Sequence, residues 1–179
     1  LDDLDLPMAV KYGVSQAILD AVAKSQRMTM TEVLAREYGT KIENQPLRFF
    51  TQSGDNYYYS VDKMILRRIP VFPHGLINSV ARLQKLLDYV KWTNQRIRDL
   101  VPDESYNPTL HYDVYGNLGL ALKNDVNRMI EYLAQLEEAA KPYRLQVEDP
   151  VLMSSKADQI KIMSEIRKRI KSDGLTLKL

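Results

Sequence analysis

The 179-residue sequence predicts an α/β fold, in which helices precede a series of parallel strands. The first observation is a change of character at Asn44, where helical spacing of apolar residues gives way to strand-like runs. The second is that strand-like and helical segments alternate from there onward. The third is that these helices are long enough to return the chain across a sheet, which favours parallel strands and right-handed crossovers.

Two helices are predicted before Asn44. The first covers about residues 7–26, since a proline suits its first turn and apolar residues recur at helical spacing. The second is short. Thr29 and Glu32 match a capping box at its start, and Gly39 is placed to end it.

The alternating part begins with an extended run at residues 47–54 (LRFFTQSG), which ends at a glycine turn. Further strands are predicted at residues 69–77, 109–116, 143–150 and 175–179. The helices between them are expected at about residues 61–68, 79–100, 124–141 and 155–172. Asn124 is expected to cap the third of these helices, and Pro142 to stop it.

About five strands leave two architectures open, a small open sheet or part of a (β/α)₈ barrel, because a whole barrel needs about 250 residues. Neither end of the sequence resembles a natural chain terminus. The chain begins at Leu1 rather than at a methionine, and it ends inside the strand-like segment 175–179. We therefore expect a fragment of a longer polypeptide, which favours the partial barrel.

The composition excludes several classes of function. The absence of cysteine rules out disulfides, thiolate nucleophiles and cysteine-ligated zinc, and two histidines argue against a histidine-rich metal site. A net charge of +2 gives no reason to expect nucleic acid as a partner. No apolar run reaches the roughly 18 residues of a membrane span, and no signal peptide opens the chain, so we expect a cytoplasmic protein without a membrane partner.

Polar side chains stand at the ends of the predicted strands, where α/β proteins bind their ligands. Asp113 and Glu148 are the most informative, because each follows an apolar strand and they are about one βα unit apart. Two neighbouring carboxylates repel unless a cation lies between them, and Mg²⁺ is the usual one. The alternative is that both are ordinary solvated acids of loops.

Three further residues are weaker candidates. His74 could donate a proton or a hydrogen bond into the strand-end cavity, or it could be a structural histidine. His111 lies two residues before Asp113 on the same face of its strand, and we interpret it as structural. Gln52 follows the first strand, and by itself it carries little information.

Eight segments, in the same order through nearly the whole chain, resemble the methylaspartate ammonia-lyase family of the enolase superfamily. They are KYGVSQAILDAVAK, TQSGD, VDKMI, PHGLINSV, LLDYVKW, HYDVYG, EAAKPYRLQVEDP and LTLKL. The resemblance implies an α+β capping domain followed by a modified (β/α)₈ TIM-type barrel. Residues 1–44 would then be the end of the capping domain, and residues 45–179 the first half of the barrel.

The resemblance also implies an activity, the Mg²⁺-dependent elimination of ammonia from 3-methylaspartate to give mesaconate, with K⁺ as a possible second ion. Asp113 and Glu148 match metal ligands of the family. His74 matches the histidine that stabilises the intermediate opposite the base, and Gln52 matches a substrate-binding glutamine. The partners implied are a small amino-acid substrate and a second subunit of a homodimer.

Other features of the family are missing or altered. The third metal ligand and the lysine base would follow residue 179, so we expect these residues alone to be inactive. Asp149 stands where we expect glycine, and the stretch 80–86 is shorter than in the family. Two alternatives remain open: another reaction of the superfamily, such as racemisation or dehydration, and a non-catalytic half-barrel that binds a partner.

Overall fold

The computed structural model describes residues 3–54, 56–103 and 105–178. The chain divides into two compact units, Leu1–Leu47 and Arg48–Leu179. Within the described residues, no helix is both long and apolar enough to cross a membrane.

The first unit contains the two predicted helices, α1 (Met8–Ser25) and α2 (Met30–Tyr38). The predicted capping box of α2 is confirmed. The Thr29 hydroxyl accepts a hydrogen bond from the Glu32 N–H at 3.2 Å, and the Glu32 carboxylate accepts one from the Thr29 N–H at 2.6 Å. Gly39 ends the helix in the left-handed conformation, as its position predicted.

The second unit contains a parallel four-stranded sheet in the order β1-β2-β3-β4. The strands are β1 (Val71–Leu76), β2 (Thr109–Asp113), β3 (Arg144–Glu148) and β4 (Leu175–Lys178). Each neighbour in the sheet is also the next strand along the chain, so the predicted strand–helix–strand alternation with parallel pairing is confirmed.

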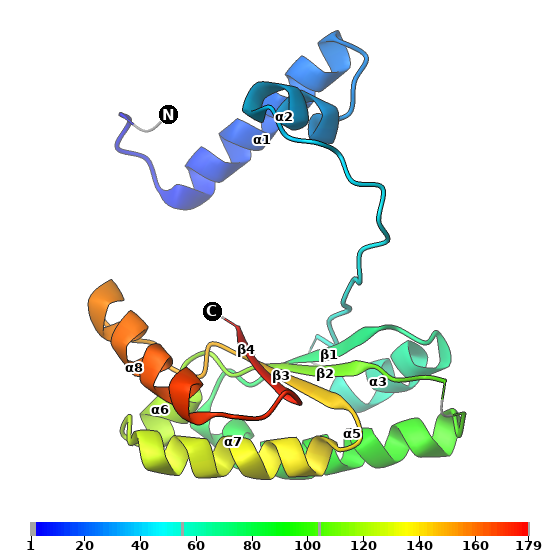
Figure 1. Ribbon diagram of the computed structural model, residues 1–179, viewed down its shortest axis with the longest axis vertical. Coiled ribbons are helices and arrows are strands. Elements are labelled where there is room, and N and C mark those ends of the chain that lie inside the picture. Colours follow the sequence, from blue (N-terminus) through cyan, green and yellow to red (C-terminus); the bar gives the residue numbers. More distant parts are fainter. Residues whose placement is uncertain (1–2, 55, 104, 179) are drawn as a thin grey trace. The chain divides into compact units, whose positions relative to one another are not determined.

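The helices of this unit are α3 (Tyr57–Leu66), α4 (Val80–Leu83), α5 (Leu86–Leu100), α6 (Asn117–Ala121), α7 (Val126–Ala140) and α8 (Lys156–Arg169). In Figure 1, α5 and α7 run side by side below the sheet, and α8 lies next to α7. One face of the sheet is therefore covered by α5 and α7.

Two sequence predictions about the helices are wrong, and one helix was missed. The single helix expected at 79–100 is two helices, because the N–H of Lys85 bonds to the carbonyl of Arg82, three residues back instead of four. The cap of α7 is Asp125 rather than Asn124, and its carboxylate accepts bonds from two N–H groups of the first turn. The short helix α6 was not expected.

The first predicted strand, at residues 47–54, is also largely wrong. Only an isolated parallel bridge joins Phe50 to Val71, supported by N–H bonds from Thr51 and Ser53 to carbonyls of β1. Leu47 is 87% exposed, and Phe50 is exposed as well. Within the described residues the segment has no strand on its outer side, so it follows the edge of β1 without extending the sheet.

Alternation along the central strands separates two faces of the sheet. Leu110 and Tyr112 of β2 are fully buried, and the Tyr112 ring packs edge-on against Tyr89 of α5 at 5.7 Å. These residues belong to the apolar core between the sheet and the helices. The side chains that alternate with them, His111 and Asp113, therefore lie on the face opposite the helices.

A two-bonded ion pair joins α3 to α5. Arg96 donates from Nε and Nη2 to the two carboxylate oxygens of Asp62, at 2.7 and 2.6 Å. The hydrogen bond from Arg96 lowers the pKa of Asp62 below its ordinary value. Because the pair is about one-third exposed, its contribution to stability is modest.

Asp62→Asn is expected to lower the free energy of unfolding by about 0.5–1 kcal/mol at pH 7. A lowered pKa in the folded state adds stability above the ordinary pKa of aspartate and loses it as the pH falls through the folded value. The difference from wild type should therefore shrink as the pH falls below the ordinary pKa of aspartate, as measured by urea unfolding at pH 7 and at a series of acidic pH values. Asp173→Asn, at an exposed position, is the control. Equal losses in the two variants would contradict the role of the pair.

Candidate functional site

The carboxyl ends of β1, β2 and β3 bring three of the four predicted site residues together. Asp113 and Glu148 are direct partners in the register of β2 and β3. In β1 the register shifts between Pro73 and Gly75, and His74 lies in this bulge with a φ of 45°. A bulge changes the direction of a side chain relative to a regular strand, which accounts for the contact of His74 with β2.

The side chains of His74, His111 and Glu148 form a compact cluster at this edge of the sheet. The Nδ1 atoms of His74 and His111 are 3.2 Å apart. The Glu148 Oε2 atom lies 2.8 Å from His111 Nε2 and 3.8 Å from His74 Nδ1. The Phe50 ring packs on both imidazoles, with its centroid 5.0 Å from that of His74 and 5.9 Å from that of His111. The cluster therefore combines polar atoms with an apolar wall.

Glu148 also reaches the next strand. Its Oε1 atom lies 2.8 Å from Nζ of Lys178, the residue opposite it in the register of β3 and β4. Burial alone would raise the pKa of Glu148, but the hydrogen bond and charge of Lys178 outweigh burial and lower it. Glu148 is therefore ionised at neutral pH.

The neighbouring groups respond differently to the same surroundings. Burial and the charge of Glu148 raise the pKa of Asp113, although a hydrogen bond from the Tyr115 N–H opposes the shift. Burial, followed by the charges of Asp113 and Glu148, also raises the pKa of Asp149. Burial and the proximity of His74 lower the pKa of His111 to about 4, so His111 is neutral at pH 7. Three acids at one edge favour a cation there.

Sequence reasoning found part of this arrangement. Asp113 and Glu148 adjoin each other as expected, and His74 lies beside Glu148. Gln52 is exposed on the segment beside β1, and among the described contacts no hydrogen bond or ion pair joins it to the other three residues. The roles of these four residues remain predictions.

Two residues in the cluster were underestimated or missed. His111 was interpreted as structural, although its two-residue spacing from Asp113 already placed both side chains on the same face of the strand. The sequence analysis argued against a histidine-rich metal site and did not consider a mixed group, whereas His74, His111 and Glu148 offer ligand atoms that all lie within 4.8 Å of one another. Lys178 was missed, because its contact depends on the register of β3 and β4.

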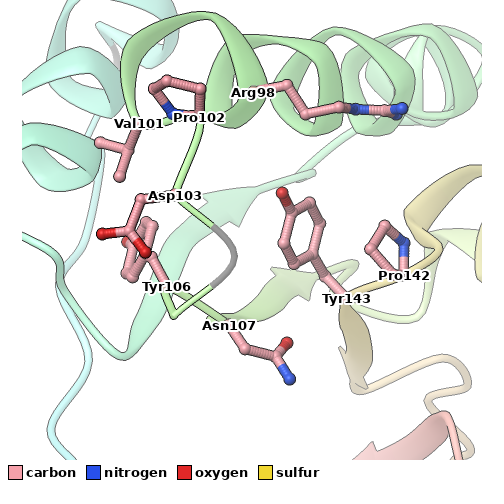
Figure 2. Close-up of a pocket in the computed structure, with 8 residues that line it drawn as sticks. All are labelled: Arg98, Val101, Pro102, Asp103, Tyr106, Asn107, Pro142 and Tyr143. Carbon is pink, nitrogen blue, oxygen red and sulfur yellow. The ribbon is translucent and has the colours of Figure 1, made fainter.

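A separate cavity of about 620 Å³ lies at the other end of the strands. The segments that lead into β2 and β3 form it, and Figure 2 shows Tyr106 and Tyr143 on opposite sides of the opening. Its lining residues are Arg98, Val101, Pro102, Asp103, Tyr106, Asn107, Pro142 and Tyr143. This cavity is not the candidate site, because the side chains of the candidate site lie at the carboxyl ends of the strands.

Comparison with known proteins identifies relatives of this chain. Residues 41–179 match the family described as methylaspartate ammonia-lyase C-terminus, and residues 2–39 match methylaspartate ammonia-lyase N-terminus. Methylaspartate ammonia-lyase 1 of Carboxydothermus hydrogenoformans is 45% identical over 166 residues, which cover 90% of this chain and 39% of the relative.

Solved structures agree with the sequence matches. β-Methylaspartase from Clostridium tetanomorphum, solved as a Mg complex, has a TM-score of 0.82 at 41% identity and covers 99% of this chain and 45% of its own. The Citrobacter amalonaticus enzyme, solved with (2S,3S)-3-methylaspartic acid, has a TM-score of 0.87 at 41% identity, with coverage of 99% and 45%.

These matches confirm the predicted fold class, an α/β structure that corresponds to part of an enolase-superfamily barrel. The chain spans less than half the length of the relatives it matches. Together the two family matches include residues 2–39 and 41–179. The chain therefore belongs to the methylaspartate ammonia-lyase family.

Proposed function

We propose that these residues form part of a carbon–nitrogen lyase that eliminates ammonia from 3-methylaspartate to give mesaconate. The observation that carries the proposal is the pairing of Asp113 with Glu148 at the ends of β2 and β3, with His74 beside them. The solved relative that contains (2S,3S)-3-methylaspartic acid supports the choice of substrate. The chain spans 45% of that relative, so the enzyme would need further groups from outside these residues.

The residues at the strand ends fit a magnesium ion. Asp113 and Glu148 offer the carboxylate oxygens that Mg²⁺ prefers, and the buried Glu148 Oε2 has no hydrogen-bond partner. When bound, the ion would supply positive charge where negative charge develops on the substrate carboxylate as the neighbouring C–H loses its proton. A relative solved as a Mg complex supports this cofactor, and the family resemblance implies K⁺ as a second ion.

The other residues would bind and orient the substrate. His74 is held through Nδ1, which lies 3.2 Å from His111 Nδ1, so Nε2 is the nitrogen that a substrate can approach. From that atom His74 would hydrogen-bond the intermediate opposite the base. Gln52 would bind the substrate through its side-chain amide. A homodimer is proposed for the whole enzyme from the same resemblance.

The direct test is mesaconate formation from 3-methylaspartate by the whole enzyme, followed by ultraviolet absorbance with and without Mg²⁺. We expect product only when the ion is present. Product formation that is unaffected by complete removal of divalent metal would contradict the proposed role of Asp113 and Glu148.

His74→Ala is expected to lower kcat about 100-fold, because positioned hydrogen-bond or proton donors typically contribute 10²–10⁴-fold to rate. KM should change much less, since the interaction strengthens mainly as the intermediate forms. Initial rates across substrate concentrations separate the two constants. His74→Gln retains a side-chain N–H donor and should keep more activity than the alanine variant. An unchanged rate for His74→Ala would show that the histidine is structural.

A further inference from the structure

We propose that His74, His111 and Glu148 form a transition-metal site that is distinct from the carboxylate pair and shares only Glu148 with it. The site would bind Zn²⁺ or Co²⁺ through two imidazole nitrogens and one carboxylate oxygen. The inference does not depend on the lyase reaction, because it requires only that these three side chains bind one ion.

The separations of the ligand atoms suit such an ion. Tetrahedral zinc with bonds of about 2.0–2.1 Å places its ligand atoms about 3.4 Å apart. His111 can give an ion only one of its two ring nitrogens. Its Nε2 lies 2.8 Å from Glu148 Oε2, and that oxygen lies 3.8 Å from His74 Nδ1. These two separations lie on either side of the ideal value, and one ligand atom from each of the three residues lies within 4.8 Å of the others, so side-chain rotations would bring the three groups around one ion.

Two buried atoms of the cluster have no hydrogen-bond partner. They are His111 Nε2 and Glu148 Oε2, which lie 2.8 Å apart. The His111 side chain is only 2% exposed, so water does not readily satisfy its nitrogen. A buried polar atom without a partner is costly, and a shared ion would satisfy both atoms at once.

The contact with Lys178 leaves the second carboxylate oxygen of Glu148, Oε2, available to bind an ion. Lys178 Nζ contacts Oε1, the other carboxylate oxygen, at 2.8 Å. Oε2 is thus the oxygen that faces the two imidazoles. Phe50 covers both rings, which limits access of water to the cluster and strengthens electrostatic interactions within it.

The ligand types decide which ion is preferred. Imidazole nitrogens suit zinc, cobalt and nickel, whereas Mg²⁺ prefers oxygen ligands. Asp113 belongs to the carboxylate pair and is not one of these three ligands. Because Glu148 cannot serve two ions fully, Zn²⁺ or Co²⁺ should compete with Mg²⁺ for it.

The test is a titration of the metal-free protein with Co²⁺, read from its visible absorption, since imidazole coordination changes the intensity and position of the cobalt bands. We expect a saturable signal with one ion per chain. His111→Asn should weaken Co²⁺ binding at least about 100-fold, because even the loss of an outer partner of a metal ligand costs 10–100-fold. His74→Gln provides a second ligand loss if His111→Asn does not fold, as checked by circular dichroism.

Asp113→Asn is the matched control, and it should retain the Co²⁺ signal with an affinity changed less than about tenfold. In a parallel Mg²⁺ titration the order should reverse, with Asp113→Asn weakened and His111→Asn retained. Absence of a saturable Co²⁺ signal would overturn the histidine site, as would a signal that both histidine variants keep. Failure of the Mg²⁺ arm alone would instead count against the proposed function.

Discussion

Asp113→Asn is expected to lower mesaconate formation by the whole enzyme about 1,000-fold. The substitution keeps the size of the side chain and removes the charge that, with Glu148, would hold the metal at the ends of β2 and β3. Charge stabilisation by a metal is worth several kcal/mol, and about 4 kcal/mol corresponds to a factor of 1,000 in rate. The loss should appear both in kcat/KM and in the Mg²⁺ concentration needed for half-maximal activity.

Asp149→Asn is the control that separates the effect of metal coordination on the rate from the effect of net charge. Asp149 is the next residue after Glu148, and its pKa is raised by burial and by the charges of Asp113 and Glu148, so it shares their electrostatic environment. Its replacement removes a carboxylate beside the proposed ligands and should lower activity less than about tenfold. Similar losses in both variants would mean that net charge, and not coordination by Asp113, controls the rate.

The periodic part of the fold was predictable from the sequence. Spacing and alternation of apolar residues located the strands from β1 onward, and the helices between them implied parallel pairing. The break between α4 and α5 was not predicted, and at this break the Lys85 N–H bonds to the carbonyl of Arg82, three residues back. In the short helix α6, a Cβ on Gly119 would lie 2.5 Å from the side-chain oxygen of Asn124, so a larger residue there would require this exposed side chain to move.

The site was predictable where it follows from strand ends and unpredictable where it depends on register. Strand order placed Asp113 beside Glu148, but the contacts of His74 require the bulge in β1, and those of Lys178 require the pairing of β3 with β4. Asp149 illustrates a further limit. It stands where the family resemblance predicts glycine, and its φ of 47° lies in the left-handed region that glycine adopts without strain. The sequence alone shows that Asp149 departs from the family resemblance. The backbone shows that it does so at a position whose conformation favours glycine.

Glu148→Gln is expected to lower Mg²⁺-dependent activity about 1,000-fold and also to abolish the Co²⁺ signal at saturating concentrations for wild type. Glu148 belongs to both proposed ion sites, and the contact with Lys178 keeps it ionised. Glutamine retains the shape and one oxygen for Lys178, so the sheet should remain folded. Activity assays, the cobalt titration and urea unfolding together measure the three consequences.

Glu138→Gln is the matched control for this double effect. Glu138 also pairs with a lysine, Lys141, at 2.6 Å, but its side chain is 73% exposed and lies on α7, away from the strand ends. Its replacement should leave activity and the Co²⁺ signal near the wild-type values. If Glu148→Gln lost only the Co²⁺ signal, Glu148 would not be a ligand of the catalytic ion. If it lost only activity, the histidine cluster would bind cobalt without its carboxylate, and if it lost neither, both ion sites would be wrong.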